Sequence, residues 1–240
     1  NSFPGFCSPE AGSDKGAEKV SKRPKSSSDI GTTVSLFPLS GALLLPRTQR
    51  PLVVFEPRYI SLIDCVLGGD RLLGLVQPLS DTEESPADRQ APLRSVGCLG
   101  YITQFEELPD ERYMIVLEGV CRFEIIDEVL SDFPYRTANI SVERYLSDFD
   151  RSVGEAEVDR AGFLTVMQNY AEFADIDFDW AGIKEISTAD LVNTCCLLSP
   201  YGASEKQVLL EAPTLAQRAE TLIALAELEM ARSQLGVKLQ

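Results

Sequence analysis

Three aspartates near the middle of the helical half form the most metal-like pattern of the sequence. Asp175, Asp177 and Asp179 alternate with apolar residues, as in the first five positions of a calcium-binding loop. Such a loop needs glycine at its sixth position and glutamate at its twelfth, where this chain has Trp180 and Ile186. The pattern fails at both decisive positions, so we predict that the segment holds no metal.

The same segment leaves two interpretations open. In the first, it is a solvated acidic connection between helices, with Phe178 and Trp180 packed against them. In the second, the two rings are exposed among carboxylates and contact an extended peptide with basic and apolar side chains, through apolar burial and cation–π interactions. We therefore treat Phe178 and Trp180 as candidate partner-binding residues.

Motifs for catalysis are missing from the sequence. The chain has no histidine, which excludes Ser-His-Asp and Cys-His catalysis and His-ligated zinc. It contains no P-loop, no G-x-S-x-G and no dinucleotide-binding glycine motif. Carboxylate clusters such as Glu106-Glu107 and Asp110-Glu111 lie in predicted loops, whereas general acid–base catalysis needs carboxylates held in an apolar cleft. We predict no catalytic residue, no metal ligand and no cofactor.

Two arginines are further candidates for partner contact. Arg58 precedes Tyr59, and a guanidinium beside an aromatic ring can hold a peptide carboxylate. In the alternative interpretation Tyr59 lies on the apolar face of a short helix, and Glu56 and Arg58 fix the start of that helix. Arg122 alternates with the apolar residues on either side, so it points away from the apolar face of its strand, and the same two interpretations apply.

Composition narrows the class of partner. The 240 residues include 22 Lys+Arg and 37 Asp+Glu, so the net charge is 22 − 37 = −15. Nucleic acids and anionic membranes both attract basic surfaces, so we expect neither as a partner. No apolar run approaches the roughly 18 residues of a membrane span, and the first thirty residues contain no apolar signal segment. The six cysteines form no C-x-x-C pair and several lie in apolar runs, which predicts buried free thiols and a cytoplasmic protein.

The chain divides into three parts. Residues 1–32 are rich in Ser, Gly and Pro and show no periodicity, which predicts a disordered tail. Residues 33–149 read mainly as strands and residues 150–240 as helices. Hydrophobic residues make up 44% of the chain, enough to form a core. We therefore predict an α+β fold.

The strand part combines short apolar runs, period-2 alternation and one helical pattern. Tyr59, Leu62, Ile63 and Val66 recur at helical spacing, which predicts a short helix over 56–67 that plugs the core. Alternation after residue 120 and over 138–142 predicts half-buried antiparallel strands, and together the elements predict a small antiparallel β-barrel. The other apolar runs and expected strands are Val34–Pro38, Ala42–Leu45, Leu52–Phe55, Leu72–Gln77, Ser95–Phe105 and Tyr113–Glu118.

The helical part shows three sequence signatures of helix starts. They are Ser187–Asp190, Ser204–Gln207 and Thr214–Gln217. The last of them opens a helix that we expect to run to about Ser233. A barrel joined to a helical bundle predicts a cleft at the junction, bordered by the connections 146–154 and 174–187.

Several pieces of the sequence, in order, resemble the N-terminal domain of Lon proteases. The order and spacing of the pieces carry the resemblance, which covers about residues 33–235. In the strand part the pieces are Leu36-Phe37-Pro38-Leu39, Leu44-Leu45-Pro46, the run 51–59, the run 70–77, Val96-Gly97-Cys98-Leu99-Gly100 and the run 117–123. In the helical part they are Ala189-Asp190-Leu191-Val192, the run 205–211 and Leu215-Ala216-Gln217-Arg218.

The resemblance implies a PUA-like barrel followed by a helical bundle, and a role in contacting protein or peptide. The chain is similar to stand-alone bacterial Lon N-terminal-domain proteins. Lon proteases continue into ATPase and Ser-Lys protease modules, whereas this sequence ends at Gln240. We therefore expect a non-catalytic module of protein quality control that recognises unfolded polypeptide or a protein partner. The alternatives are an accessory subunit of an ATP-dependent Lon-type protease and an RNA-binding PUA-like domain, and the acidic charge disfavours the second.

Overall fold

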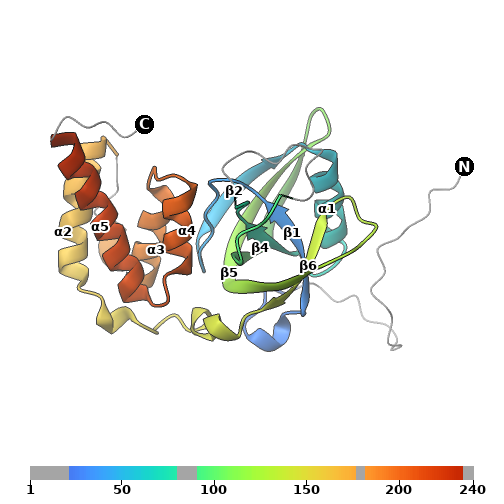
Figure 1. Cartoon of the computed structure of the whole chain (residues 1–240), viewed down its shortest axis with the longest axis horizontal. Coiled ribbons are helices and arrows are strands. Elements are labelled where there is room, and N and C mark those ends of the chain that lie inside the picture. Colours follow the sequence, from blue (N-terminus) through green and yellow to red (C-terminus); the bar gives the residue numbers. More distant parts are fainter. Residues whose placement is uncertain (1–21, 80–90, 177–181, 235–240) are drawn as a thin grey trace, which may run out of the picture.

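The structure is a computed structural model that describes residues 22–79, 91–176 and 182–234. Strands fill the first half and helices most of the second, which confirms the α+β class (Figure 1). The strands are β1 (Thr33–Pro38), β2 (Gln49–Val54), β3 (Leu72–Val76), β4 (Val96–Leu108), β5 (Arg112–Val129) and β6 (Arg136–Ser141). The helices are α1 (Pro57–Leu67), α2 (Arg160–Ala174), α3 (Thr188–Leu198), α4 (Ala203–Glu211) and α5 (Leu215–Gln234). Short 3₁₀ turns occur at Ser27–Asp29, Glu143–Phe149, Glu155–Glu157 and Gly182–Glu185.

One long strand organises the sheet. The six strands have the order β2-β5-β4-β3-β1-β6, and β5 pairs with β6 as well as with β2 and β4. β5 can reach all three neighbours because it has 18 residues and its pairing is interrupted by irregularities between Leu99 and Gly100 and between Ile125 and Asp127. Such bulges bend a strand and increase its twist.

The pair β1–β3 corrects the prediction of an antiparallel barrel. These two strands run parallel, with Leu36 opposite Gly74 and Phe37 opposite Leu75, while the other pairs are antiparallel. A parallel pair needs a long crossover connection, and the segment that contains β2 and α1 provides it. The sequence pattern of short alternating runs does not carry this information.

Helix α1 agrees with its prediction. Pro57 occupies its first turn and Gly68 caps its C-terminal end. Pro fits this position because the first turn has no intrahelical acceptor for its N–H. The predicted stripe is buried in the main core, beside Phe37 and Leu75 on the sheet, and consists of Tyr59, Leu62, Ile63 and Val66.

Two segments differ from the expected pattern. Ala42–Leu45 is buried but belongs to no strand. The backbone of Leu45 bonds to a side chain, since the Thr48 Oγ1 accepts its N–H (3.1 Å) and donates to its carbonyl (2.8 Å). Residues 22–32, assigned above to the tail, are part of the fold. Arg23 forms an ion pair of 2.6 Å with Glu118 on β5, and residues 1–21 lie outside the described residues.

Two of the three predicted helix starts are confirmed. The Ser187 hydroxyl accepts the N–H of Asp190 (3.0 Å), and the Thr214 hydroxyl accepts the N–H of Gln217 (3.1 Å). The third is wrong, because α4 begins after Gly202 and Ser204 lies inside the helix. Glycine is an acceptable N-cap residue since its extended backbone is unstrained there.

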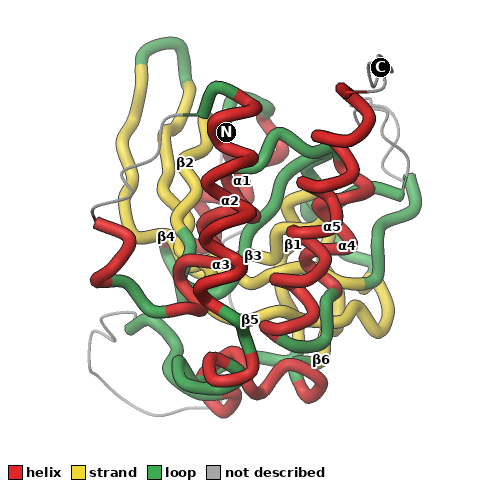
Figure 2. The backbone as a smooth tube through the Cα atoms, turned by 90° about the vertical axis from the view of Figure 1, so that its left-hand side faces the viewer, coloured by secondary structure: helices red, strands yellow, loops and turns green. Residues whose placement is uncertain are grey.

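Helices α2 to α5 cover one side of the strand part (Figure 2), and α1 lies on the other side (Figure 1). α3 and α4 lie between the strands and the pair α2 and α5 (Figure 1). Polar side chains join the layers: Gln77 donates to the Gln207 side chain (3.1 Å), and Gln207 donates to the carbonyl of Val96 (3.1 Å). One hydrophobic cluster runs from the strands into the buried face of α5, so strands and helices share a core.

Candidate functional site

Two cavities contain residues singled out by the sequence. One of about 410 Å³, called here the groove, lies between the end of β1, the strand β2 and the start of α1, and Arg58 and Tyr59 line it. The other, of about 130 Å³ and called here the junction cavity, lies where strands meet helices, and Arg122 lines it. The structure therefore brings Arg58 and Tyr59 together and separates them from Arg122. Phe178 and Trp180 lie outside the described residues.

Stacked side chains form the floor of the groove. The rings of Phe37 and Tyr59 stack with centroids 4.3 Å apart, and the Arg58 guanidinium carbon stands 4.5 Å from the Tyr59 ring centroid. Arg58 Nε bonds to the Glu56 carboxylate at 2.9 Å, and the Tyr59 hydroxyl donates to the Pro38 carbonyl at 3.4 Å. The floor is therefore held in place by packing, and the charge of Arg58 is balanced within it.

Apolar side chains form the wall of the groove, and two of them are largely exposed. Val53 is 51% exposed and Phe55 is 66% exposed. Leu79 is also exposed, next to Pro78 in the lining. The remaining apolar lining comes from Pro38, Leu39, Leu52 and Val54. A cavity of this size is in the range of about 300–1,000 Å³ typical of ligand sites, and clustered exposed apolar residues mark interaction surfaces.

The strand beside the groove is an edge strand. Among the described strands, β2 pairs only with β5, so one side of its backbone is unpaired. Pro51 lies in its middle, and proline is found in sheets chiefly on edge strands because it cannot donate to a ladder. An unpaired edge can accept an extended peptide as an additional strand.

Arg122 lies in the interior, contrary to the expectation of a partner-binding residue. Its side chain is 3% exposed, and its Nε and Nη2 bond to the two carboxylate oxygens of Asp148 at 2.9 and 2.8 Å. Its Nη1 donates to the carbonyls of Leu210 and Ala212 at 3.1 and 2.6 Å. Each guanidinium nitrogen therefore has a partner within the chain, and the residue ties β5 to the C-terminal end of α4 and its capping residue.

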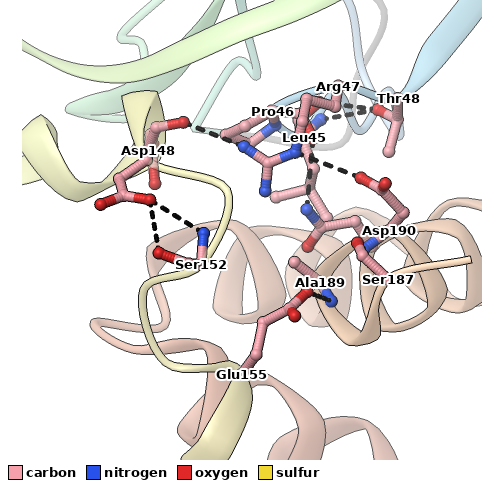
Figure 3. A network of polar contacts seen from close by, with 12 residues as sticks. Leu45, Pro46, Arg47, Thr48, Asp148, Ser152, Glu155, Ser187, Ala189 and Asp190 are labelled. Carbon is pink, nitrogen blue, oxygen red and sulfur yellow. Dashed lines mark hydrogen bonds and ion pairs between the residues drawn. The ribbon is translucent and has the colours of Figure 1, made fainter.

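Arg47 forms a second link between strands and helices (Figure 3). Its Nε bonds to the Asp190 carboxylate on α3 at 3.1 Å, and its Nη1 donates to the Asp148 carbonyl at 3.1 Å. Nearby, the Asn193 amide donates to the Pro46 carbonyl at 3.2 Å. The connection 146–154 borders the junction cavity as predicted, whereas the described residues of 174–187 do not line it.

Neither nucleophiles nor metal ligands gather in the part of the chain that the structure describes. No three His, Cys, Asp or Glu side chains in that part lie close enough together to hold a metal ion. The five described cysteines are free thiols. Burial raises the pKa of Cys195 and of Cys196, each to about 12, and raises the pKa of Cys98 well above its usual value. Thiolates are therefore not formed near neutral pH at these positions.

Sequence reasoning missed the two exposed groove residues, Val53 and Phe55. The run Leu52–Phe55 reads as a buried strand because it is continuously apolar. The signal of an edge strand in the sequence is Pro51, which directly precedes this run.

The described helices lack the combination of length and apolar composition that crossing a bilayer requires.

Comparison with known sequences gives one consistent result. Residues 33–227 match the family described as the ATP-dependent protease La (LON) substrate-binding domain. The chain is 27% identical over 215 residues to the Lon protease of Flavobacterium johnsoniae, covering 88% of this chain and 26% of that protein. It is 28% identical over 209 residues to Lon protease 2 of Sorangium cellulosum, covering 83% of this chain and 25% of that protein. The chain thus spans about a quarter of the length of these curated relatives.

Solved structures show the same fold at low sequence identity. The Lon N-terminal domain protein from Xanthomonas campestris has a TM-score of 0.58 at 21% identity, covering 80% of this chain and 98% of that chain. The N-terminal domain of the Lon protease from the Mycobacterium avium complex has a TM-score of 0.57 at 16% identity, covering 81% and 98%. With the family match over most of its length, the chain belongs to the LON substrate-binding domain family.

Proposed function

We propose that this chain is a non-catalytic module that binds unfolded or extended polypeptide in the groove. The observation that carries the proposal is the coincidence of an apolar groove of about 410 Å³ with the unpaired edge of β2. The exposed Val53 and Phe55 give the peptide an apolar contact at the same place. The family's description as a substrate-binding domain supports this role.

The geometry favours binding by strand addition. An extended peptide alongside β2 gains main-chain hydrogen bonds that do not depend on its sequence, and every second side chain faces the groove. The groove favours apolar side chains, because its wall is apolar and Arg58, the one cation among its described lining residues, already pairs with Glu56. The preferred ligand is therefore an extended segment with alternating apolar residues, which folded proteins keep buried.

Three finer statements belong to the same proposal. The pairing of β5 with β6 supports a PUA-like barrel as the description of the strand part. The acidic charge supports protein rather than RNA as the partner. Buried free thiols support a reducing compartment, the cytoplasm.

A binding assay with matched variants tests the proposal. We expect fluorescein-labelled, unfolded casein to bind the wild-type chain, and Phe55→Ser to weaken binding about tenfold or more, since burying a Phe side chain is worth about 1.5–3 kcal/mol. Leu130→Ser is the control, because Leu130 is fully exposed on the connection between β5 and β6, outside the groove lining. Fluorescence anisotropy measures both affinities, and equal binding by the two variants and the wild type contradicts the groove as the site.

Two further measurements separate the finer statements. An extended peptide bonds to a strand edge through every second backbone N–H, and N-methylation removes that donor. Two peptides, methylated at the odd-numbered or at the even-numbered amides, therefore differ in the donors they keep. We expect one of these two methylation patterns to abolish binding. Equal affinity for both patterns and for the unmethylated peptide contradicts strand addition.

In the same anisotropy assay we expect single-stranded RNA not to bind. In a separate experiment we expect mass spectrometry to find casein uncleaved after incubation with the chain, with and without ATP.

A further inference from the structure

We propose that the junction cavity binds one small inorganic anion, held by Arg218 and the N-terminal end of α5. Arg218 lines this cavity, and the residue is 3% exposed. Its Nε donates to the Leu209 carbonyl at 2.9 Å, and its Nη1 donates to the Asn193 side chain at 2.8 Å. Its Nη2 has no hydrogen-bond partner among the described residues. A buried guanidinium with an unused donor is costly, and an anion supplies the missing acceptor.

The charges around Arg218 do not balance. Arg122 and Arg218 are both buried at the junction, and Asp148 is the only buried carboxylate among the described residues that line the cavity. Both oxygens of Asp148 bond to Arg122. Burial, together with repulsion from Arg122, lowers the pKa of Arg218 to about 10, so the residue still carries its charge near neutral pH. One positive charge is therefore left without a matching anion.

The helix that carries Arg218 adds to this excess. Arg218 lies at the start of α5, a helix of 20 residues whose first turn contains no acidic side chain. The N-terminal end of a helix carries a partial positive charge, and here the Thr214 hydroxyl bonds the amide of Gln217, so the end disfavours a cation and favours an anion chiefly through its charge. Leu215, the first residue of α5, also lines the cavity. An anion placed there accepts from Arg218 and from the helix end together.

The size of the cavity and its outer charges limit the anion to a small one. A volume of about 130 Å³ is well below that of sites for organic ligands, roughly 300 Å³ and more. The other cation in the lining, Arg47, pairs with Asp190. The carboxylates of Asp150 and Glu157 also line the cavity but are exposed, so they repel large polyanions such as nucleotides. Chloride and inorganic phosphate share the required chemistry.

A bound anion in this position fastens the two parts of the molecule. The lining comes from the strand part through Pro46 and Arg122, and from the helical part through Asn193 and Arg218. Because the anion binds the folded chain only, it stabilises that state by an amount that grows with the logarithm of one plus the ratio of anion concentration to dissociation constant. The expected signature is a dependence of thermal stability on the identity of the anion, separate from general salt screening.

Thermal melting at constant ionic strength tests this inference without reference to the groove. The buffer salt is sodium gluconate, whose anion is too large for the cavity, and it is replaced stepwise by sodium chloride or by sodium phosphate. We expect at least one of the two to raise the melting temperature with the logarithm of its concentration above the dissociation constant, by about 3–6 °C at tenfold that constant. No difference among the three salts overturns the proposal.

Variants and diffraction locate the effect. Arg218→Met removes the guanidinium at similar length and should abolish the anion response, while the control Arg144→Gln, at an exposed arginine outside the cavity, should keep it. If Arg218→Met does not fold, bromide-soaked crystals of the wild type give an independent answer through anomalous scattering. A bromide peak beside Arg218 and Leu215 is expected. An anion response that persists in Arg218→Met, or bromide peaks only at other sites, overturns the proposal.

Discussion

Replacing Asp148 with alanine tests how strongly the buried ion pair holds strands and helices together, and the chain contains a matched control. Arg122 and Arg144 both stand over the ring of Tyr145, at 4.4 and 5.7 Å from its centroid. Arg122 pairs with Asp148 at 2.8 Å, and Arg144 pairs with Glu124 at 2.9 Å. The side chains of the first pair are 3% and 7% exposed, and those of the second are 53% and 33% exposed. The two pairs differ in burial and in the number of hydrogen bonds that hold them.

The expected magnitude follows from what Asp148 binds. Its carboxylate accepts three charge-assisted hydrogen bonds from Arg122, from the backbone N–H (2.9 Å), Nε (2.9 Å) and Nη2 (2.8 Å). Asp148→Ala leaves the guanidinium charged, buried and unpaired on that side, and breaking a buried pair in this way costs about 3–5 kcal/mol. It also leaves Arg122 and Arg218 facing each other without a buried carboxylate. Glu124→Ala leaves Arg144 in water, where exposed pairs contribute little.

Urea unfolding followed by circular dichroism at 222 nm measures the difference. With a slope of about 2 kcal/mol per molar urea, a loss of 4 kcal/mol lowers the midpoint by about 2 M. We expect that shift for Asp148→Ala and almost none for Glu124→Ala. The double variant Arg122→Met with Asp148→Ala should recover part of the loss, because the Arg122 guanidinium is no longer buried without its carboxylate. Equal midpoints for the two single variants, with unchanged slopes, would refute the assignment of Arg122 and Asp148 as the central link of the junction.

Three further outcomes are expected. Leu62→Ala should lower the free energy of unfolding by about 2–5 kcal/mol in the same urea assay, because Leu62 is fully buried in the core; a loss below about 0.5 kcal/mol would contradict that packing. Gly119→Ala should lower the melting temperature by several degrees or prevent folding, because a Cβ there would stand 2.0 Å from the Leu45 carbonyl oxygen; an unchanged melting temperature would contradict this approach. Cys195 and Cys196 should resist iodoacetamide at pH 8 in the native protein and react in urea, because burial raises the pKa of each thiol to about 12; peptide mapping that finds either residue labelled under native conditions would contradict their burial.

Local signals in the sequence predicted those elements whose cause is local. Helix α1 has a proline at its start, a glycine at its end and an apolar stripe between them, and each signal acts within one or two turns. The starts at Ser187 and Thr214 follow from side chains that bond amides three residues on. The parallel pair β1–β3 could not be predicted in this way, because it depends on how the connection 39–71 packs and not on the residues that pair.

Arg122 shows why the contacts at the junction could not be predicted from the sequence pattern. Alternation along β5 correctly places Arg122 on the face opposite Cys121 and Phe123. The alternation does not say what lies against this face, and in the structure the C-terminal end of α4 and its capping residue offer the carbonyls of Leu210 and Ala212 to Arg122. Five consecutive residues of β5, from Gly119 to Phe123, are buried, so both faces of the strand are covered there. Periodicity states which side chains share a face, and only tertiary packing decides what lies against that face.

The groove and the junction differ in whether their bonding groups are satisfied within the chain. At the junction, polar groups are enclosed and nearly all are paired, which fixes the strands against the helices. At the groove, apolar side chains and a strand edge are left open, which in most proteins invites aggregation. The charge of −15 opposes self-association while leaving the edge accessible to a flexible chain. The floor under that edge is held by Phe37, Tyr59 and Arg58, so an incoming peptide meets a preformed surface and does not have to order the site.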